Sequence, residues 1–65
     1  MKWTVIVTVS TQRKTEDIKV EHIYTDGNAR YIAEDIAIAR VMMNEAINKR
    51  RFLRVDGVKA WREKE

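Results

Sequence analysis

The fold of this chain is decided by the stretch WTVIVTVS at residues 3–10. Large apolar side chains alternate there with Thr or Ser, and most of them are β-branched, which suits a strand buried on one side. Successive side chains of a strand point to opposite faces. One face therefore carries Trp3, Val5, Val7 and Val9. The other face has Ile6 as its only large apolar residue, so we expect the first strand of a sheet covered on one side.

Residues 18–24 continue the alternation and predict a second strand, paired antiparallel with the first. Regular alternation would place Ile18, Val20, His22 and Tyr24 on one side of this strand. On that apolar side we expect His22 to lie at the edge of the core, hydrogen-bonded to backbone or water, and not to bind a metal.

The Asp26-Gly27 pair marks a turn that could be followed by either of two structures. It suits a tight hairpin into a third strand at residues 29–32. However, the residues that follow are strong helix formers, and Asn28 is a good N-cap. We therefore expect a helix over about residues 29–50, a range that contains no Gly or Pro.

The expected helix carries more apolar surface than one small sheet can cover. The stripe predicted to face the sheet comprises Ala29, Ile32, Ile36, Ala39, Met43, Ala46 and Ile47. A second stripe lies beside it, and a chain of 65 residues has little left to cover that stripe. We expect self-association, with a dimer as the first choice, through Tyr31, Ile38, Val41 and Met42. The alternative is that this stripe contacts the C-terminal segment of the same chain.

Residues 52–61 are the last element and have two interpretations. Asp56-Gly57 suits a two-residue turn of a hairpin in which Phe52 lies opposite Trp61. Alternatively, the glycine belongs to one continuous strand and marks a bulge. In both cases the predicted fold class is α+β: a single domain over residues 1–65, a small two-layer ββαβ(β) domain whose antiparallel sheet packs on one long helix.

Positive charge is concentrated at the C-terminal end. Residues 1–48 carry six Lys or Arg and seven Asp or Glu, whereas residues 49–65 carry seven Lys or Arg and three Asp or Glu. The net charge of +3 therefore arises from the last segment, which favours an anionic partner. The predicted partner-binding residues are Phe52, Trp61, Arg51, Arg54, Lys59 and Arg62.

The residue types that catalysis requires are missing or isolated. The chain has no Cys, a single serine (Ser10), a single histidine (His22) and no Gly-rich phosphate loop. A zinc site needs three or four ligands, and His22 supplies only one nitrogen. We therefore expect no enzymatic activity, no cofactor and no metal. No apolar run approaches the roughly 18 residues of a membrane span and no signal-peptide pattern is present, so a cytoplasmic location is expected.

These features predict a non-catalytic binding or regulatory module. The first hypothesis is a small self-associating inhibitor or accessory protein, of the phage or mobile-element type, whose basic-aromatic patch docks on an anionic protein or nucleotide surface. The second is nucleic-acid binding, in which the same patch stacks bases and neutralises phosphates. The third is a structural assembly subunit, which needs no such patch.

Overall fold

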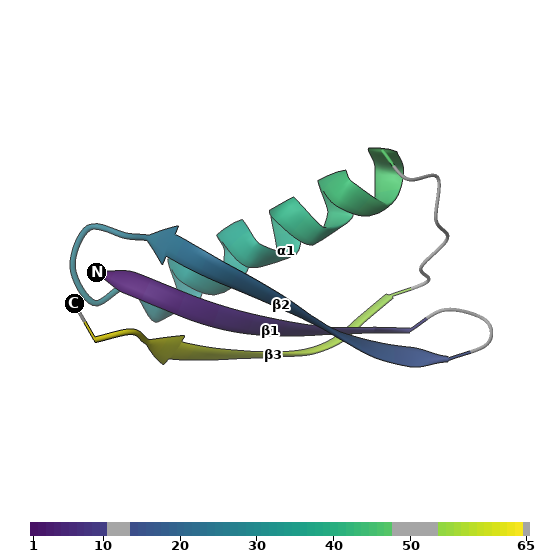
Figure 1. The fold of residues 1–65 in the computed structure, drawn as a ribbon, viewed down its shortest axis with the longest axis horizontal. Helices are drawn as coiled ribbons and strands as arrows, with labels where there is room; N and C mark the ends of the chain where they lie inside the picture. The colour runs from purple at the N-terminus through teal and green to yellow at the C-terminus, as the bar shows by residue number, and fades with distance from the viewer. Residues whose placement is uncertain (11–13, 48–53, 65) are drawn as a thin grey trace.

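The computed structural model of the chain describes residues 1–10, 14–47 and 54–64. Its elements are, in order, β1 (Lys2–Ser10), β2 (Thr15–Tyr24), α1 (Arg30–Ile47) and β3 (Arg54–Arg62). The strands form one antiparallel sheet in the order β2-β1-β3, and α1 lies across one of its faces (Figure 1). The predicted α+β domain with element order ββαβ is confirmed. No helix in these described ranges is long and apolar enough to cross a membrane.

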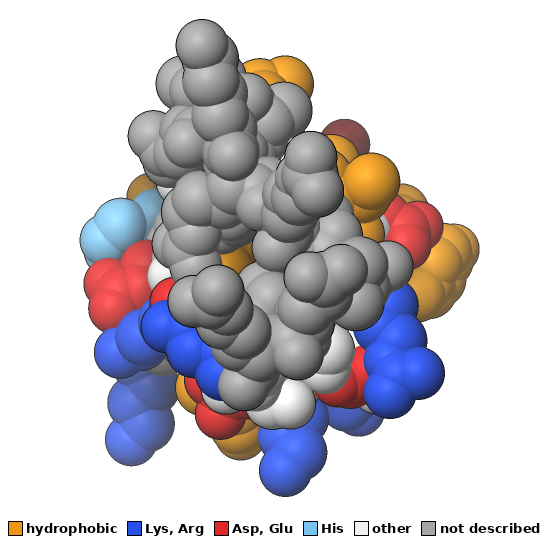
Figure 2. Space-filling view, turned by 90° about the vertical axis from the view of Figure 1, so that its right-hand side faces the viewer, with side chains coloured by type: hydrophobic (Ala, Val, Ile, Leu, Met, Phe, Trp, Pro, Cys, Tyr) orange, Lys and Arg blue, Asp and Glu red, His pale blue; other side chains and the backbone are white. Residues whose placement is uncertain are grey.

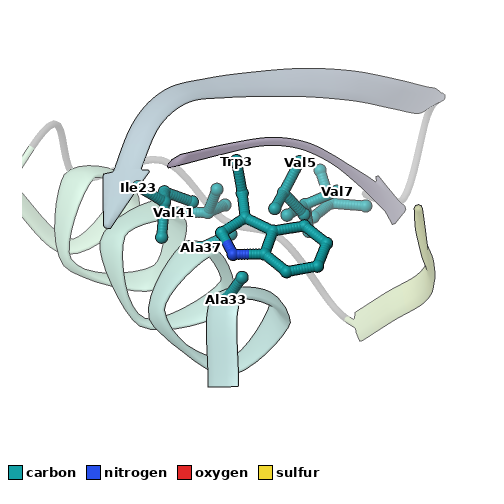
Figure 3. Close-up of a cluster of buried hydrophobic side chains, with 8 residues drawn as sticks. Trp3, Val5, Val7, Ile23, Ala33, Ala37 and Val41 are labelled. Carbon is teal, nitrogen blue, oxygen red and sulfur yellow. The ribbon is translucent and has the colours of Figure 1, made fainter. Parts of the chain in front are cut away.

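The central strand is β1, the stretch from which the fold was predicted. It pairs with β2 on one side and β3 on the other, so its backbone polar groups are used on both sides. The predicted alternation is confirmed, because every second residue of β1 is buried. The core contains Trp3, Val5, Val7 and Val9 from β1, Ile23 from β2, and Ala33, Ala37 and Val41 from α1 (Figure 3).

The helix faces the sheet with residues other than those predicted. Ala33, Ala37 and Val41 are buried in the core. Of the stripe predicted to lie on the sheet, Ile32 is 42% exposed and Met43 is 67% exposed. The prediction that these two residues face the sheet was therefore wrong, and α1 is rotated about its axis relative to the prediction. Ile36 of the same stripe does pack against the core. The side chains of Ala46 and Ile47 are outside the part of the chain that the structure describes.

The helix is rotated because of the volumes of the side chains that lie between it and the sheet. Trp3 and the three valines of β1 fill the middle of this layer, so small alanines opposite them let the helix backbone come close. The larger Ile36 and Ile38 pack against the core from the two flanks of α1. Val41 is only 3% exposed, so the prediction that it takes part in self-association was wrong.

An extra residue in β2 reverses the alternation of this strand near its end. The register with β1 shifts between Trp3 and Val5, so both Glu21 and His22 lie opposite Thr4. This arrangement is a β-bulge, in which two residues of one strand face one residue of its neighbour.

The bulge corrects the predicted faces of β2. Ile18 and Val20 pack against the core as predicted, but beyond the bulge it is Ile23 that is buried. His22 and Tyr24 are exposed. His22 has a φ of 60°, the left-handed conformation that His adopts more readily than most residues. The prediction that His22 and Tyr24 share the apolar side was wrong, because it assumed unbroken alternation.

The last element is one bulged strand and not a hairpin. β3 pairs antiparallel with β1 along its length, with Asp56 as the extra residue in the register. Trp61 lies opposite Thr4. Of the two interpretations of Asp56-Gly57, the bulge is therefore confirmed. Phe52 lies outside the described residues.

The Asp26-Gly27 turn is followed by a helix and not by a strand at residues 29–32, so the predicted helix is confirmed. Gly27 has a φ of 71°, and its carbonyl accepts hydrogen bonds from the Thr25 hydroxyl at 2.9 Å and from the Ala29 N–H at 3.0 Å. The helix begins at Arg30. Its predicted end near residue 50 lies outside the described residues.

Candidate functional site

The candidate functional site is the face of the sheet that α1 does not cover, which we call the open face. Alternation from the buried valines places every second residue of β1 on it, and the strand registers then assign the residues of β2 and β3. Its central row consists of Lys2, Thr4, Ile6, Thr8 and Ser10. The register positions that flank this row include Asp17, Lys19 and Tyr24 on β2, and Arg54, Lys59 and Trp61 on β3.

Trp61 is the largest side chain on the open face and is 48% exposed. Val58 and Ala60 of the same strand pack against the core, so alternation turns Trp61 to the other side of the sheet. Trp61 lies opposite Thr4, a small polar residue that leaves the indole ring accessible. A half-exposed tryptophan on a polar surface is typical of a residue that anchors a binding partner.

The basic side chains of the open face are mostly paired with acidic ones. Lys2 lies 3.4 Å from Glu63, and Lys19 lies 3.0 Å from Glu21. The guanidinium of Arg54 lies 2.6 Å from Asp56. Figure 2, which views the molecule from one end, shows red acidic side chains among the blue basic ones around its lower half, where the sheet lies. Over the residues that the structure describes, the open face therefore has mixed charge rather than a basic excess.

Lys59 differs from the other basic residues of the open face. It lies opposite Ile6 and forms no ion pair with any other described residue. Lys19 flanks Ile6 on the other side, so two lysines and one isoleucine form a row across all three strands. On β3 this row is two residues from Trp61, the spacing at which side chains of a strand share a face.

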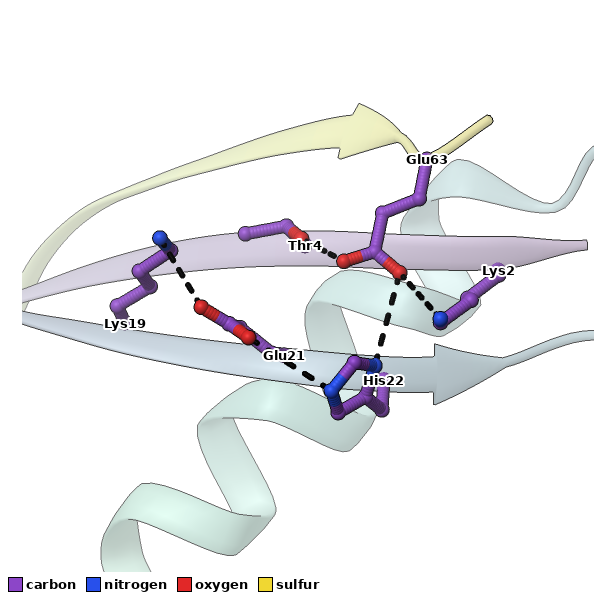
Figure 4. Close-up of polar contacts among 6 residues, drawn as sticks. All are labelled: Lys2, Thr4, Lys19, Glu21, His22 and Glu63. Atoms are coloured by element: carbon purple, nitrogen blue, oxygen red, sulfur yellow. Dashed lines mark hydrogen bonds and ion pairs between the residues drawn. The ribbon is translucent and has the colours of Figure 1, made fainter. Parts of the chain in front are cut away.

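A polar cluster fixes the backbone next to Trp61 (Figure 4). The Glu63 N–H donates to the Lys2 carbonyl at 2.8 Å, and the Thr4 hydroxyl donates to Glu63 Oε1 at 2.5 Å. Glu63 Oε2 is shielded from water and accepts no hydrogen bond, but it lies 3.4 Å from Lys2 Nζ and 3.8 Å from His22 Nδ1. Lys2 and Thr4 of β1 therefore hold Glu63, two positions beyond Trp61, and His22 of β2 lies beside it.

Hydrogen bonds shift the pKa values of two carboxyl groups on the open face. The Thr4 hydroxyl lowers the pKa of Glu63; partial burial opposes this shift and Lys2 adds to it. At the other end of the sheet, the Ser10 hydroxyl and, to a smaller extent, Arg54 lower the pKa of Asp56, again against partial burial. Both groups are therefore ionised at neutral pH and keep their basic partners neutralised.

The structure brings together part of the predicted partner-binding patch. Arg54, Lys59 and Trp61 occupy open-face positions of β3. Arg62 lies opposite Trp3, which places it on the side of the helix. At the end of the sheet it lines a shallow depression together with Lys2 and Glu63. Arg51, like Phe52, lies outside the described residues.

Two of the residues predicted for self-association are accessible on α1. Tyr31 is 70% exposed and Met42 is also exposed, whereas Ile38 is partly buried against the core. Together with the burial of Val41, this arrangement leaves no continuous stripe through the four predicted residues.

Sequence reasoning missed the contribution of β2 to the open face. Lys19 lies between Ile18 and Val20, so its alternation with these two residues was a usable signal for its position. Tyr24 had no such signal, because its face depends on the bulge at His22.

The residues considered for catalysis are far apart in the fold. Ser10 is at one end of β1, and His22 lies beside Thr4 near the other end. Ser10 is six positions along β1 from Thr4, a distance of about 20 Å. Among the residues that the structure describes, no three His, Asp or Glu side chains are grouped so that they could hold a metal ion.

Comparisons with known proteins find no family model, no curated protein and no solved structure that matches this chain.

Proposed function

We propose that this protein is a non-catalytic binding module that docks its open face on another protein. Trp61 is the anchor of this interaction, and Lys59 faces an acidic group of the partner. The observation that carries the proposal is the exposure of Trp61 beside Lys59, which has no ion-pair partner among the described residues, on a sheet face whose other side chains are mostly polar. Aromatic anchors surrounded by a polar rim are the usual source of affinity in protein interfaces.

The balance of charge on the open face favours a protein partner over a nucleic acid. The described residues of this face include four basic and four acidic side chains: Lys2, Lys19, Arg54 and Lys59, and Asp17, Glu21, Asp56 and Glu63. Three of the basic side chains already have acidic partners. Affinity for a nucleic acid rises with the number of phosphates that cations neutralise, and one unpaired lysine supplies about one such contact. A protein surface, by contrast, accommodates both signs of charge at the rim of an interface.

The rigidity of the surroundings supports this role. Trp61 is on a strand paired with β1, and Glu63 is held by Lys2 and Thr4. A surface that is already ordered loses little conformational entropy on binding, which favours affinity. An inhibitor or adaptor that acts by occupying a partner surface needs no further chemistry.

The proposal is tested by affinity capture from the native host with matched variants. We expect a specific protein to be retained by the wild type and lost with Trp61→Ala and with Lys59→Glu. Tyr31→Ala is the control, because it removes an exposed aromatic residue from α1 and should retain the partner. Circular dichroism is used to check that each variant is folded. A partner that survives both open-face substitutions would refute the proposed surface.

A second measurement separates the two classes of partner. Binding of a random single-stranded oligonucleotide is titrated at low salt with the wild type and with Trp61→Ala. We expect the oligonucleotide not to bind at concentrations of this protein that saturate its protein partner. Binding that depends on Trp61 and weakens steeply with added salt would assign the open face to nucleic acid instead.

A further inference from the structure

The outer side of α1 has an apolar stripe that the rest of the described chain does not cover. Its residues follow the spacing of four, three and four: Ile32, Ile36, Ala39 and Met43. Ile32, Ala39 and Met43 are exposed, whereas Ile36 reaches the core with part of its side chain. Alternating steps of four and three residues are the spacing of a seam between two paired helices.

Two charged side chains flank this stripe on opposite sides. Asp35 precedes Ile36, and Arg40 follows Ala39. Both are exposed, and neither forms an ion pair with another described residue. In the notation of paired helices, Ile32 and Ala39 are at d, Ile36 and Met43 at a, Asp35 at g and Arg40 at e. Positions g and e are those whose charges select the partner and its orientation.

We propose that the occupant of this stripe is a second copy of the chain, with the two α1 helices parallel. In a parallel pair, the g residue of one helix lies beside the e residue five positions later in the other helix. Asp35 therefore meets Arg40 of the second copy, and the two-fold axis repeats this contact. The same surface of each copy forms both halves of the interface.

An antiparallel pair through the same stripe lacks this complementarity. If the symmetry axis of the antiparallel pair passes between residues 37 and 38, Ile32 packs against the Met43 of the second copy. This apolar contact would be acceptable. A two-fold axis perpendicular to the helices, however, places both copies of Asp35 on one side of the seam and both copies of Arg40 on the other. Like charges then face each other, so charge selects the parallel arrangement.

The seam is short, so the dimer should be reversible. The 18 residues of α1 extend about 27 Å, which is less than three heptads of seam. By sedimentation equilibrium we expect the mean mass to rise from 7.7 kDa toward twice that value as concentration increases. Ile32→Glu places a charge in the seam twice per dimer and should weaken association at least about 100-fold. Tyr31→Glu, on the neighbouring exposed position outside the seam, is the matched control and should leave association unchanged.

Charge exchange tests the pairing itself. Asp35→Arg and Arg40→Asp should each weaken the dimer about tenfold, because each replaces two attractive contacts by two repulsive ones. The double variant should restore association to near the wild-type level. An antiparallel dimer would show no such restoration, since exchange leaves like charges facing each other.

Orientation is tested independently with a single cysteine, because the natural chain has none. In a parallel dimer Met43→Cys lies next to its own copy and should form a disulfide-linked dimer under mild oxidation. In the antiparallel pair the two sulfurs would be about 16 Å apart along the helix axis, too far to react. A wild type that stays monomeric, an Ile32→Glu variant that associates normally, or a Met43→Cys variant that does not cross-link would each overturn the proposal. None of these results bears on the role of Trp61, which is on the other side of the sheet.

Discussion

Deletion of His22 is predicted to leave the protein folded, although it shortens a strand by one residue. At present Glu21 and His22 share one position opposite Thr4. Without His22, Glu21 alone faces Thr4, and Ile23 keeps its place opposite Trp3. Every other residue of β2 stays on its present face, so the core is unchanged.

The magnitude follows from the conformation and contacts of His22. Its φ of 60° costs about 1–2 kcal/mol relative to the right-handed or extended conformations, and the deletion removes this cost. What is lost is small, because the ring is 61% exposed and lies 3.7 Å from Glu21 and 3.8 Å from Glu63, too far for hydrogen bonds. We expect the free energy of unfolding to be unchanged or to rise by up to about 1 kcal/mol.

Deletion of Lys19 is the matched control, because it shortens the same strand at a regular position. If the residues before it move along by one, Asp17 takes the core position opposite Val7. If the bulge absorbs the change instead, Glu21 takes the core position opposite Val5. Either outcome places a carboxylate without a partner at a partly buried position that packs against the core, at a cost of several kcal/mol. A domain of this size has only about 3–10 kcal/mol of stability, so this variant should be largely unfolded.

The assay is urea denaturation followed by tryptophan fluorescence, to which the buried Trp3 contributes, with circular dichroism as a second probe. The reasoning would be refuted if loss of His22 destabilised the fold as much as loss of Lys19. It would also be refuted if the Lys19 deletion kept wild-type stability, since β2 would then tolerate a change of register at a core position.

Three further predictions concern packing, backbone conformation and pH. Ala37→Leu should lower the free energy of unfolding by about 1–3 kcal/mol in urea titrations, because the fully buried alanine sets the distance between helix and sheet; a change below about 0.5 kcal/mol would contradict this packing. Gly27→Ala should cost about 1–2 kcal/mol, owing to its φ of 71° alone, since a Cβ would meet nothing within 4 Å. Gly57→Ala, equally uncrowded but without a positive φ, should leave the free energy of unfolding unchanged in the same urea titrations. Equal effects at both glycines would refute the positive φ of Gly27 as the cause. Because the folded state lowers the pKa of Glu63, its contribution to stability is complete above the ordinary glutamate value and is lost as the pH falls below about 4.3. Thr4→Val removes the main cause of that shift, so its melting temperature should decline less than that of the wild type between pH 6 and pH 3; an identical decline would exclude Thr4 as the cause.

The existence of the strands and of the helix was predictable because apolar residues recur at simple periods along these segments. The valines of β1 alternate without interruption, so their face could be assigned directly. Strong helix formers after Asn28 distinguished a helix from a third strand, and Asp56-Gly57 allowed the observed bulge as one of two interpretations. In the candidate site, Trp61 and Lys59 were selected because aromatic and basic residues are mixed in the C-terminal segment, and their place on one face of β3 agrees with the alternation of that strand.

The errors arose where three-dimensional packing decides between equal local patterns. The apolar surface of α1 is so wide that periodicity alone could not select Ala37 over Ile32 as the centre of the buried face; the volume of Trp3 on the opposite layer did so. His22 was misplaced because a bulge adds one residue without any obligatory sequence mark such as glycine. Tyr24 was misplaced as a consequence, since one extra residue reverses the face of everything that follows.

The two bulges lie on the two outer strands, near opposite ends of the sheet. On β2 the uninterrupted ladder runs only from Thr15 to Val20, and on β3 only from Gly57 to Arg62. An outer strand with a long, regular row of free N–H and C=O groups invites other chains to add strands to it and so grow fibres. Each edge of this sheet is interrupted instead, which disfavours such growth. Other chains are therefore less able to add a strand at β2 or β3.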